Sequence, residues 1–375
     1  MVYMYLKNIK LTNFRNYENE YIELNSNINI IYGNNAQGKT NLLESIYFLS
    51  LGKSHRSLND KDLIKNEESS CRIYGEAILN NFSKSFEIKI INNKKIYRID
   101  NNIIKSLNEY LSNLKIIIFF PEDLEIIKSS PDIRRRYLNI QISQLNRNYF
   151  KILNEYNKIL KIRNEILKNN LKDNYIDMNY FRIITNSLIE KASYIYCIRN
   201  KYINKINEFI SNYYKKISTY DGLYLKYITN LDNDIYEYEI IKNDLINKFS
   251  NLEYAELKSG ITLIGPQKDD FIFMLGNENL KNYGSQGQQR MAILSLKLSE
   301  IDIFTKESND TPILLLDDVF SELDDFKKNN LLKNINKNIQ TIITTTDINN
   351  IDGEIVKNAK LINIKNGKFI MRGED

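Results

Sequence analysis

The sequence predicts an α/β protein in which strand-forming segments at both ends of the chain flank a mostly helical middle. The first 130 residues, and those from 259 onward, contain apolar runs bounded by turn-forming residues. Between them, from about residue 134 to 214, apolar side chains recur every three or four positions, which is typical of helices. We therefore expect one α/β domain, built from residues 1–130 and 259–375, that is interrupted by a helical lobe at 131–258.

The strands are predicted from alternating or continuously apolar segments. Residues 28–32 are apolar almost throughout, as in a strand that is buried on both faces. Residues 92–95 join two alternating segments and indicate a hairpin. In chain order, the predicted strands lie at residues 4–12, 21–24, 27–32, 71–79, 85–91, 96–99 and 115–120, within 263–273, and at 312–317, 340–346, 360–364 and 368–371.

The helical middle contains two periodic runs, at about residues 149–167 and 188–213, with a turn expected at 169–174. The first apolar stripe is interrupted at Arg163. Two arrangements fit this pattern: a short antiparallel pair whose stripes pack on each other, or two ordinary bundle helices with no protruding arm. The pattern spans too few heptads to choose between them.

Composition sets only broad limits on function. The chain has 375 residues, 42% hydrophobic and 26% charged, as is usual for a globular protein of about two domains. Its net charge of +5 is compatible with a nucleic-acid-binding patch but does not establish one. Cys71 and Cys197 are far apart and indicate neither a metal pair nor a disulfide framework. No apolar run approaches the roughly 20 residues that span a bilayer, so we expect a cytoplasmic protein with no membrane partner.

The motif Gly33-Asn-Asn-Ala-Gln-Gly-Lys39-Thr40 follows an apolar strand and precedes a helix expected at 41–49. In that setting it is a Walker A loop, whose glycines let backbone amides converge on phosphate oxygens at the positive end of the helix dipole. Lys39 is expected to neutralise the β- and γ-phosphates of ATP, and the Thr40 hydroxyl to bind Mg²⁺. The residues predicted to surround the ATP phosphates are Gly33, Asn34, Asn35, Ala36, Gln37, Gly38, Lys39, Thr40 and Asn41.

An acidic pair follows a later strand. Residues 313–316 are apolar and end in Asp317 and Asp318, which is typical of a Walker B motif. Asp317 is expected to join Thr40 in the Mg²⁺ shell. Asp318 is the predicted catalytic carboxylate that orients or deprotonates the attacking water, with Lys39 as the other predicted catalytic residue.

Ser285 and Gln288 have the spacing of a capping box, which predicts that a helix begins at Ser285. Its buried face should carry Met291, Leu294, Leu298 and Ile301. The sequence Ser285-Gln286-Gly287-Gln288 resembles the ABC-class signature, whose amides and serine contact the γ-phosphate that a second subunit binds. If the resemblance holds, one chain supplies only half of each active site.

The segment Phe320-Ser321-Glu-Leu-Asp324 resembles the D-loop of ABC-class ATPases, with Ser321 and Asp324 as its candidate site residues. Taken with the other motifs, it makes the chain similar to the RecF family of bacterial recombination and gap-repair ATPases, which is related to SMC heads. The segments that carry the resemblance are, in order, Asn13-Phe-Arg15-Asn-Tyr17, the Walker A loop, Phe120-Pro-Glu-Asp-Leu124, Pro131-Asp-Ile-Arg-Arg-Arg136, Gly265-Pro-Gln-Lys-Asp-Asp270, the signature, and residues 317–324.

The resemblance implies an ABC-type P-loop ATPase head with mixed sheets, flanking helices and an inserted mostly α-helical lobe. It also implies ATP and Mg²⁺ as cofactors, and a weak DNA-stimulated ATPase that acts as a switch. The expected assembly is an ATP-dependent homodimer on gapped DNA and ss/dsDNA junctions, working with RecO and RecR to load recombinase. Roles in replication-fork maintenance and the SOS response, and a nucleoid-associated location, are implied in the same way.

Two departures from the family pattern are visible. Gln267 and Lys268 stand where the family more often has His-Arg. His55 is the only histidine, so the switch histidine that many ABC ATPases place after the last core strand is absent, and the corresponding region holds residues 345–347. His55 itself is expected to be structural, because no carboxylate or cysteine partner is visible around it in the sequence.

Two basic clusters are candidates for DNA contact, namely Lys53 with Arg56, and Arg134 with Arg135 and Arg136. For the second cluster, a role in organising the junction between domains fits equally well. A competing function is a P-loop kinase or phosphotransferase that uses the helical insertion as a lid over a small substrate. The signature-like helix at Ser285 argues against a kinase, which has no need of a phosphate contact from a second subunit.

Overall fold

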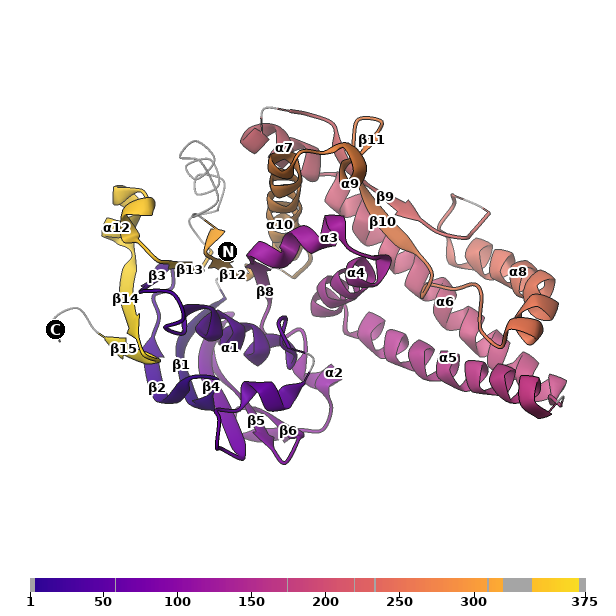
Figure 1. Ribbon diagram of the computed structural model, residues 1–375, viewed down its shortest axis with the longest axis horizontal. Helices are drawn as coiled ribbons and strands as arrows, with labels where there is room; N and C mark the ends of the chain where they lie inside the picture. The colour runs from indigo at the N-terminus through magenta and orange to yellow at the C-terminus, as the bar shows by residue number, and fades with distance from the viewer. Residues whose placement is uncertain are drawn as a thin grey trace. The chain divides into compact units, whose positions relative to one another are not determined.

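The computed structural model describes residues 4–57, 59–173, 175–218, 220–232, 234–308, 310–319 and 339–370. The chain forms two compact units, whose elements are labelled in Figure 1. Unit 1 consists of Met1–Leu124, Asn212–Asp221 and Arg290–Asp375, and unit 2 consists of Glu125–Ser211 and Gly222–Gln289. The second boundary differs from the one expected near residue 259, because the strand that begins at Asp270 pairs with a strand of unit 2.

The core of unit 1 is a six-stranded sheet of order β15-β14-β3-β13-β12-β8. Five of its strands run parallel, and β15 alone pairs antiparallel. The strand bounds are β3 (Ile28–Tyr32), β8 (Ile116–Phe119), β12 (Ile313–Asp317), β13 (Thr341–Thr345), β14 (Lys360–Lys365) and β15 (Lys368–Ile370). Because parallel strands end at one edge of a sheet, the residues after β3, β12 and β13 come together there.

The second sheet of unit 1 is antiparallel, of order β2-β1-β4-β5-β6-β7. Along β4 buried and partly exposed residues alternate, so one face of the sheet packs inward and the other meets solvent. Helix α1 covers the inner face, where Gly75 lies so close to Leu49 that an added Cβ would be 2.9 Å from its Cδ2. The strand bounds are β1 (Tyr5–Phe14), β2 (Tyr17–Glu23), β4 (Ser70–Leu79), β5 (Phe82–Ile91), β6 (Lys94–Ile99) and β7 (Asn102–Ile104).

Two central helices are buried on almost every side. These are α1 (Lys39–Leu51) and α10 (Gln286–Ser308), of which residues from Arg290 onward belong to unit 1. The apolar face predicted for α10 is buried, but so are Lys297 and Glu300 on its other sides. Lys297 pairs with the buried Asp123 at 3.2 Å, which satisfies both charges in the interior. Among the described residues, the shorter helical elements outside the lobe are α2 (Leu107–Tyr110), α7 (Ile210–Ser218), α12 (Gly353–Asn358), η1 (Asp60–Leu63), η2 (Pro121–Leu124) and η4 (Ile348–Asn350).

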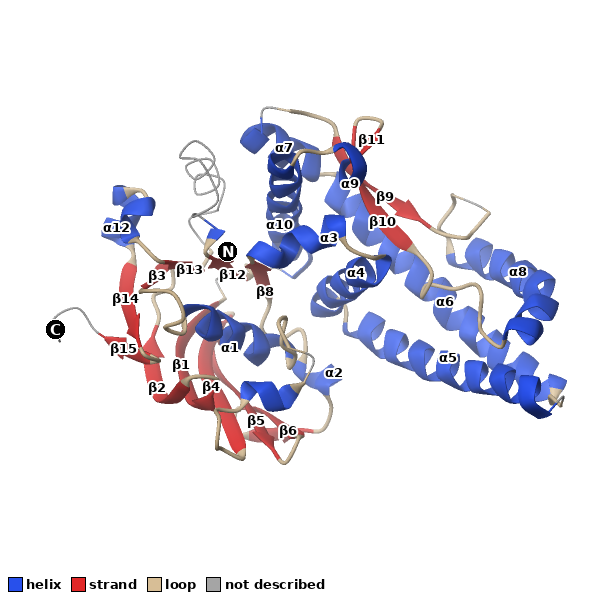
Figure 2. Ribbon diagram, in the orientation of Figure 1, coloured by secondary structure: helices blue, strands red, loops and turns tan. Residues whose placement is uncertain are grey.

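Unit 2 is mostly helical, as predicted, and adds a small antiparallel sheet of order β11-β10-β9 (Figure 2). Helices α5 and α6 lie side by side and are linked by a hydrogen bond from Arg163 to Thr185 (3.0 Å) and by the Lys191–Glu155 ion pair (2.9 Å). The turn between them comes later than expected, since α6 begins after its N-cap Asp177. The element bounds are α3 (Glu125–Lys128), α4 (Pro131–Leu145), α5 (Arg147–Asp173), α6 (Met178–Asn207), α8 (Tyr238–Ser259), α9 (Leu280–Tyr283), β9 (Leu223–Ile228), β10 (Asp270–Leu275) and β11 (Glu278–Asn279).

Arg163 explains the interruption in the first apolar stripe. Its side chain is buried and lies between the rings of Phe181 and Phe249, with Cζ 4.6 and 4.9 Å from their centroids. Its charge is balanced by Glu256 at 2.5 Å. Arg163 therefore ties α5, α6 and α8 together from the centre of the lobe. Over the described ranges, no helix combines the length and apolar character required to cross a membrane.

Candidate functional site: a phosphate-binding loop beside an acidic strand end

The loop between β3 and α1 has the geometry expected of a Walker A motif. Gly33 (φ +151°) and Gly38 (φ +119°) adopt backbone conformations that strain any residue with a side chain. Lys39 is buried, and its Nζ donates hydrogen bonds to the carbonyls of Gly33 and Asn34, both at 2.8 Å. The Lys39 side chain thus crosses the loop, and its ammonium group lies inside the loop.

Segments far away in the sequence support this loop. The carbonyl oxygen of Gln37 accepts hydrogen bonds from Asn16 Nδ2 and from the backbone amide of Gly367, both at 3.0 Å. The Tyr17 hydroxyl donates to the carbonyl of Gly38 at 2.8 Å. The β1–β2 turn and the β14–β15 turn therefore both fix the path of the loop.

The carboxyl end of β12 lies against the start of α1. Asp317 Oδ1 accepts hydrogen bonds from Thr40 Oγ1 at 3.1 Å and from Thr344 Oγ1 at 2.7 Å. The same Thr344 hydroxyl accepts the backbone amide of Asp318 at 3.0 Å. Asp318 has a positive φ of 48°, which turns the chain at this point. Thr344 was not predicted as a site residue, since its role depends on β13 pairing beside β12.

Burial controls the electrostatics of the loop and the acidic pair. It lowers the pKa of Lys39, and the negative charges of Asp318 and Asp317 partly offset the effect. It also raises the pKa of Asp317, against the hydrogen bonds from Thr344 and Thr40. A bound anion would stabilise the Lys39 ammonium and a bound cation would stabilise the Asp317 carboxylate, so the donor set fits a metal-bound polyphosphate.

These residues line a cavity of about 260 Å³. Thr346 also lines it, in the region where many ABC ATPases have the switch histidine. Among the predicted phosphate-site residues, Gly33, Asn34 and Gln37 belong to the loop without lining this cavity. Its wall is formed by Asn35, Ala36, Gly38, Lys39, Thr40, Asn41, Arg56, Asp317, Asp318 and Thr346.

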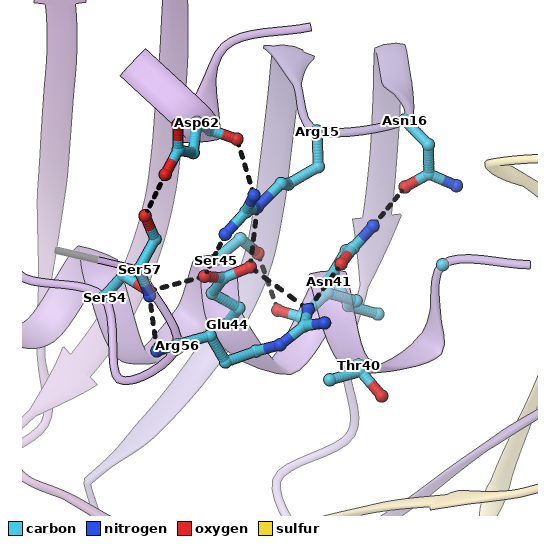
Figure 3. A network of polar contacts seen from close by, with 12 residues as sticks. Arg15, Asn16, Thr40, Asn41, Glu44, Ser45, Ser54, Arg56, Ser57 and Asp62 are labelled. Atoms are coloured by element: carbon cyan, nitrogen blue, oxygen red, sulfur yellow. Dashed lines mark hydrogen bonds and ion pairs between the residues drawn. The ribbon is translucent and has the colours of Figure 1, made fainter. Parts of the chain in front are cut away.

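Arg56, predicted as a DNA contact, lies in the wall of this cavity. A network around the buried Glu44 holds it there (Figure 3). Glu44 binds Arg15 through two hydrogen bonds of 2.9 and 2.7 Å, accepts the Ser54 hydroxyl at 2.5 Å, and lies 3.5 Å from Arg56. Arg56 also donates to Asn41 Oδ1 at 2.9 Å. The first half of α1 is therefore linked to the loop at 53–57 by two hydrogen bonds and an ion pair.

The same network keeps Glu44 charged. Burial alone would raise the pKa of this carboxyl, but the hydrogen bonds from Arg15 and Ser54 and the nearby positive charges outweigh it, and the pKa is lowered. His55 lies beside this network, with its ring 5.1 Å from that of Tyr47 and 4.9 Å from that of Phe120. Its packing between two aromatic rings agrees with the structural role expected for it.

The capping box predicted at Ser285 is present. The Ser285 amide donates to Gln288 Oε1 at 2.8 Å, and the Gln288 amide donates to Ser285 Oγ at 3.3 Å. A Cβ added to Gly287 would meet no atom closer than 4.0 Å, so packing within the chain does not require glycine there. The other predicted signature residue, Gln286, begins α10. The predicted D-loop residues, Ser321 and Asp324, lie outside the described residues.

The arginine cluster in unit 2 is partly committed to structure. Arg134 is buried and forms two hydrogen bonds with Asp270, at 2.6 and 2.9 Å. Arg135 donates to the carbonyl of Asp269 at 2.6 Å and pairs with Asp132. These contacts lie within unit 2, where they join α4 to the start of β10, and they do not test the role at the domain junction expected from the sequence. Arg136, and Lys53 in unit 1, are exposed.

Arg199, a buried arginine that was not predicted as a site residue, holds the loop at 265–269. Arg199 donates to Asp269 Oδ2 at 2.5 Å and to the carbonyl of Pro266 at 2.6 Å. Gln267 is fixed separately by the Tyr156 hydroxyl, while Lys268 is exposed. The residues that depart from the family pattern therefore sit on a loop whose backbone is anchored on both sides.

Comparisons with known proteins identify the family of the chain. The family model "RecF/RecN/SMC N terminal domain" matches residues 5–368. The chain is 38% identical over 369 residues to the DNA replication and repair protein RecF of Bacillus subtilis, covering 98% of this chain and 100% of that one. It is 39% identical over 366 residues to RecF of Geobacillus sp. strain WCH70, covering 97% and 98%.

Solved structures give the same result. The structure of the recombination mediator protein RecF with ATP, described as part of the RecFOR pathway, superposes with a TM-score of 0.91 at 36% identity, covering 98% of this chain and 97% of that one. A Pyrococcus furiosus Smc head domain superposes with a TM-score of 0.55 at 16% identity, which supports the shared fold. The kinase alternative is not favoured by these matches. Because the family model matches residues 5–368 and 98% of the chain aligns with a RecF at 38% identity, the chain belongs to the RecF family of DNA replication and repair proteins.

Proposed function

We propose that this protein is an ATP-operated dimer of recombinational gap repair, in which each ATP is bound by the Walker residues of one copy and the Ser285 helix end of another. The observation that carries the proposal is the cavity lined by Lys39, Thr40 and Asp318, which would hold the phosphates of ATP. A second observation supports it. Gly287 has open space around its Cα, which would admit a ligand from another molecule.

The residues present fit Mg²⁺ with ATP. Thr40 and Asp317 place two oxygen ligands 3.1 Å apart, and the described residues contain no group of three or more His, Cys, Asp or Glu that could hold a metal. This is the usual situation for Mg²⁺, which takes its remaining ligands from phosphates and water and would neutralise developing phosphate charge. Lys39 would bind the phosphates, and Asp318 would orient the attacking water.

The proposed setting is DNA with single-strand gaps and ss/dsDNA junctions, and the proposed partners are RecO and RecR. Family membership and the likeness to a RecFOR-pathway structure support this setting. Because each site needs two copies, ATP turnover should be slow and should rise with protein concentration and with DNA.

Mixing two inactive variants tests the shared site. Lys39→Ala removes the phosphate lysine and Ser285→Ala removes the helix-end hydroxyl, so each variant alone should lose ATPase activity. In a mixed dimer, both changes fall in one site and the other site is intact, so mixing should restore activity. Activity that stays absent on mixing, with a rate per subunit that is constant over a dilution series of the unmodified protein, would refute the proposal.

Ser106→Ala is the control for lost capping. Ser106 also caps a helix, accepting the Glu109 amide at 3.4 Å, and it lies outside the cavity. Loss of a capping serine costs about 1 kcal/mol of stability in either variant. If the two variants have similar melting temperatures and only Ser285→Ala loses ATPase activity, the loss is due to the contact with the second copy and not to the loss of a helix cap. Light scattering with ATP and Mg²⁺ should show a monomer-to-dimer shift.

A further inference from the structure

The outer face of the antiparallel sheet in unit 1 carries a group of cationic side chains that the ATP site does not use. We call it the basic sheet face. Four adjacent strands contribute to it, in the order β1, β4, β5, β6. Its members are Lys10, Arg72, Lys89, Lys94 and Arg98.

Strand register places these residues on one face. Arg72 lies directly opposite Lys89, and Glu87 lies opposite Arg98. Lys10 is opposite Tyr74, two residues along β4 from Arg72. Because side chains alternate between faces, these positions share a face, whereas the intervening positions pack against α1. All five cations are at least partly exposed.

The charges on this face are not balanced. Glu87 is the shared partner of three cations, at 2.7 Å from Arg72, 2.7 Å from Arg98 and 3.5 Å from Lys89. Lys10 and Lys94 form no ion pair with any residue in the described ranges. Like charges directly opposite one another, such as Arg72 and Lys89, weaken strand pairing. The sheet thus keeps an excess of positive charge at a cost in stability.

The face also has a polarity along the strands. Apart from Glu87, its acidic members Glu23 and Glu76 lie opposite Asn8 of β1, beyond the five cations. At the basic end, the ring of Tyr74 lies 5.3 Å from the Arg72 guanidinium carbon, and Tyr21, which lies opposite Lys10, is 51% exposed. An exposed aromatic ring can stack on an unpaired base, so the experiment below compares a duplex with a single-stranded oligonucleotide.

The dimensions suit a duplex. Neighbouring strands are about 4.8 Å apart, so cations on four adjacent strands span roughly 14 Å, comparable with the roughly 12 Å width of the major groove of B-DNA. We propose that the basic sheet face binds the phosphate backbone of double-stranded DNA. The proposal rests on the proposed function, because it names the surface on which DNA lies.

Salt dependence of DNA binding tests the assignment. The full-length variant Lys10→Gln/Lys89→Gln/Lys94→Gln removes three cations and keeps Arg72 and Arg98, which neutralise Glu87. Each lost phosphate contact should reduce the slope of log K against log salt by about 0.9, so this variant should lose about 2.7. Between 50 and 200 mM salt, the affinity of the unmodified protein should then fall about 40-fold more than that of the variant.

The matched control is Lys360→Gln/Lys365→Gln/Lys368→Gln, which removes three partly or fully exposed strand lysines from the other sheet of unit 1. It should leave the salt slope for a 30-base-pair duplex unchanged, and the first variant should bind ATP normally. A slope that is unchanged in the first variant, or reduced equally in the control, would overturn the assignment.

Two further ligands distinguish the occupants. Binding of the first variant to a single-stranded oligonucleotide, and to polyglutamate as a probe for an acidic protein, is measured in the same way. If the variant binds only one of these two ligands more weakly and binds the duplex normally, the duplex assignment is overturned. If the unmodified protein binds no DNA at all with ATP and Mg²⁺, the proposed function fails as well. If it binds DNA with an unchanged slope in the first variant, only the surface assignment fails.

Discussion

Thr344→Val should weaken the metal-dependent part of ATP binding. The Thr344 side chain is completely buried, donates to Asp317 Oδ1 at 2.7 Å and accepts the Asp318 amide at 3.0 Å. Valine keeps the shape and the strand preference of threonine but removes the hydroxyl. The variant therefore tests one oxygen atom that links the Asp317 carboxylate and the Asp318 backbone amide to the neighbouring strand.

The expected magnitude follows from the two bonds that are lost. A buried donor left without its acceptor costs about 1–3 kcal/mol, which is the expected effect on the free energy of unfolding. Asp317 would retain only Thr40 as a hydroxyl donor, and its pKa, already raised by burial, would rise further. A 1.4 kcal/mol penalty for binding through this carboxylate corresponds to about a tenfold loss of affinity.

The matched control is Thr341→Val on the same strand. Thr341 is also buried, but its hydroxyl donates only to the Ile339 carbonyl, at 3.2 Å. Calorimetric titration with ATP, with and without Mg²⁺, should show the tenfold loss for Thr344→Val in the presence of Mg²⁺ only. Urea unfolding of both variants measures the accompanying loss of stability.

Two results would refute this reasoning. Equal effects of the two substitutions on Mg²⁺-dependent ATP affinity would mean that the loss of any buried threonine hydroxyl disturbs the site. An equal loss with and without Mg²⁺ would mean that Thr344 shapes the phosphate loop itself and does not act through Asp317.

Three further outcomes are expected. Gly367→Ala should weaken ATP binding about fivefold, because a Cβ there would lie 2.6 Å from the Asn16 carbonyl oxygen beside the Walker A loop. The control is Gly276→Ala, where φ is also positive (+59°) but no atom lies within 4 Å; it should not change ATP affinity in the same titration. Burial lowers the pKa of His55 to about 4, so between pH 6.5 and 4 only the unfolded chain binds this proton. As the pH falls through that window, the free energy of unfolding should therefore decrease by up to about 3 kcal/mol. Urea unfolding of His55→Gln should show a smaller decrease over the same pH range. Lys39→Arg should reduce ATPase turnover more than nucleotide binding, because a guanidinium does not reproduce the compact ammonium contact, and normal turnover would exclude Lys39 as the phosphate lysine.

Features set by neighbouring residues could be predicted from the sequence. The Walker A loop, the strand before it and the capping box at Ser285 depend on contacts within a few positions, so their spacing specifies them. The alternation in residues 223–228 was also a usable signal for β9, although the lobe was expected to be helical.

Features that depend on strand order could not be predicted in the same way. Thr344 reaches Asp317 because β13 pairs in parallel with β12, and Gly367 reaches Gln37 because β14 pairs with β3. The buried charges of Arg163 and Arg199 were likewise hidden, since a sequence pattern shows a polar residue but not the carboxylate that will neutralise it.

The position of β3 within its sheet has a consequence for synthesis on the ribosome. The strand that presents the Walker A loop pairs with β13 and β14, whose residues lie between Thr341 and Lys365. A nascent chain that stops before these strands therefore has its complete phosphate motif but neither strand that flanks it in the sheet. The chain would then bind ATP only after β13 and β14 have been synthesised, and prematurely terminated chains that lack these strands would not bind ATP.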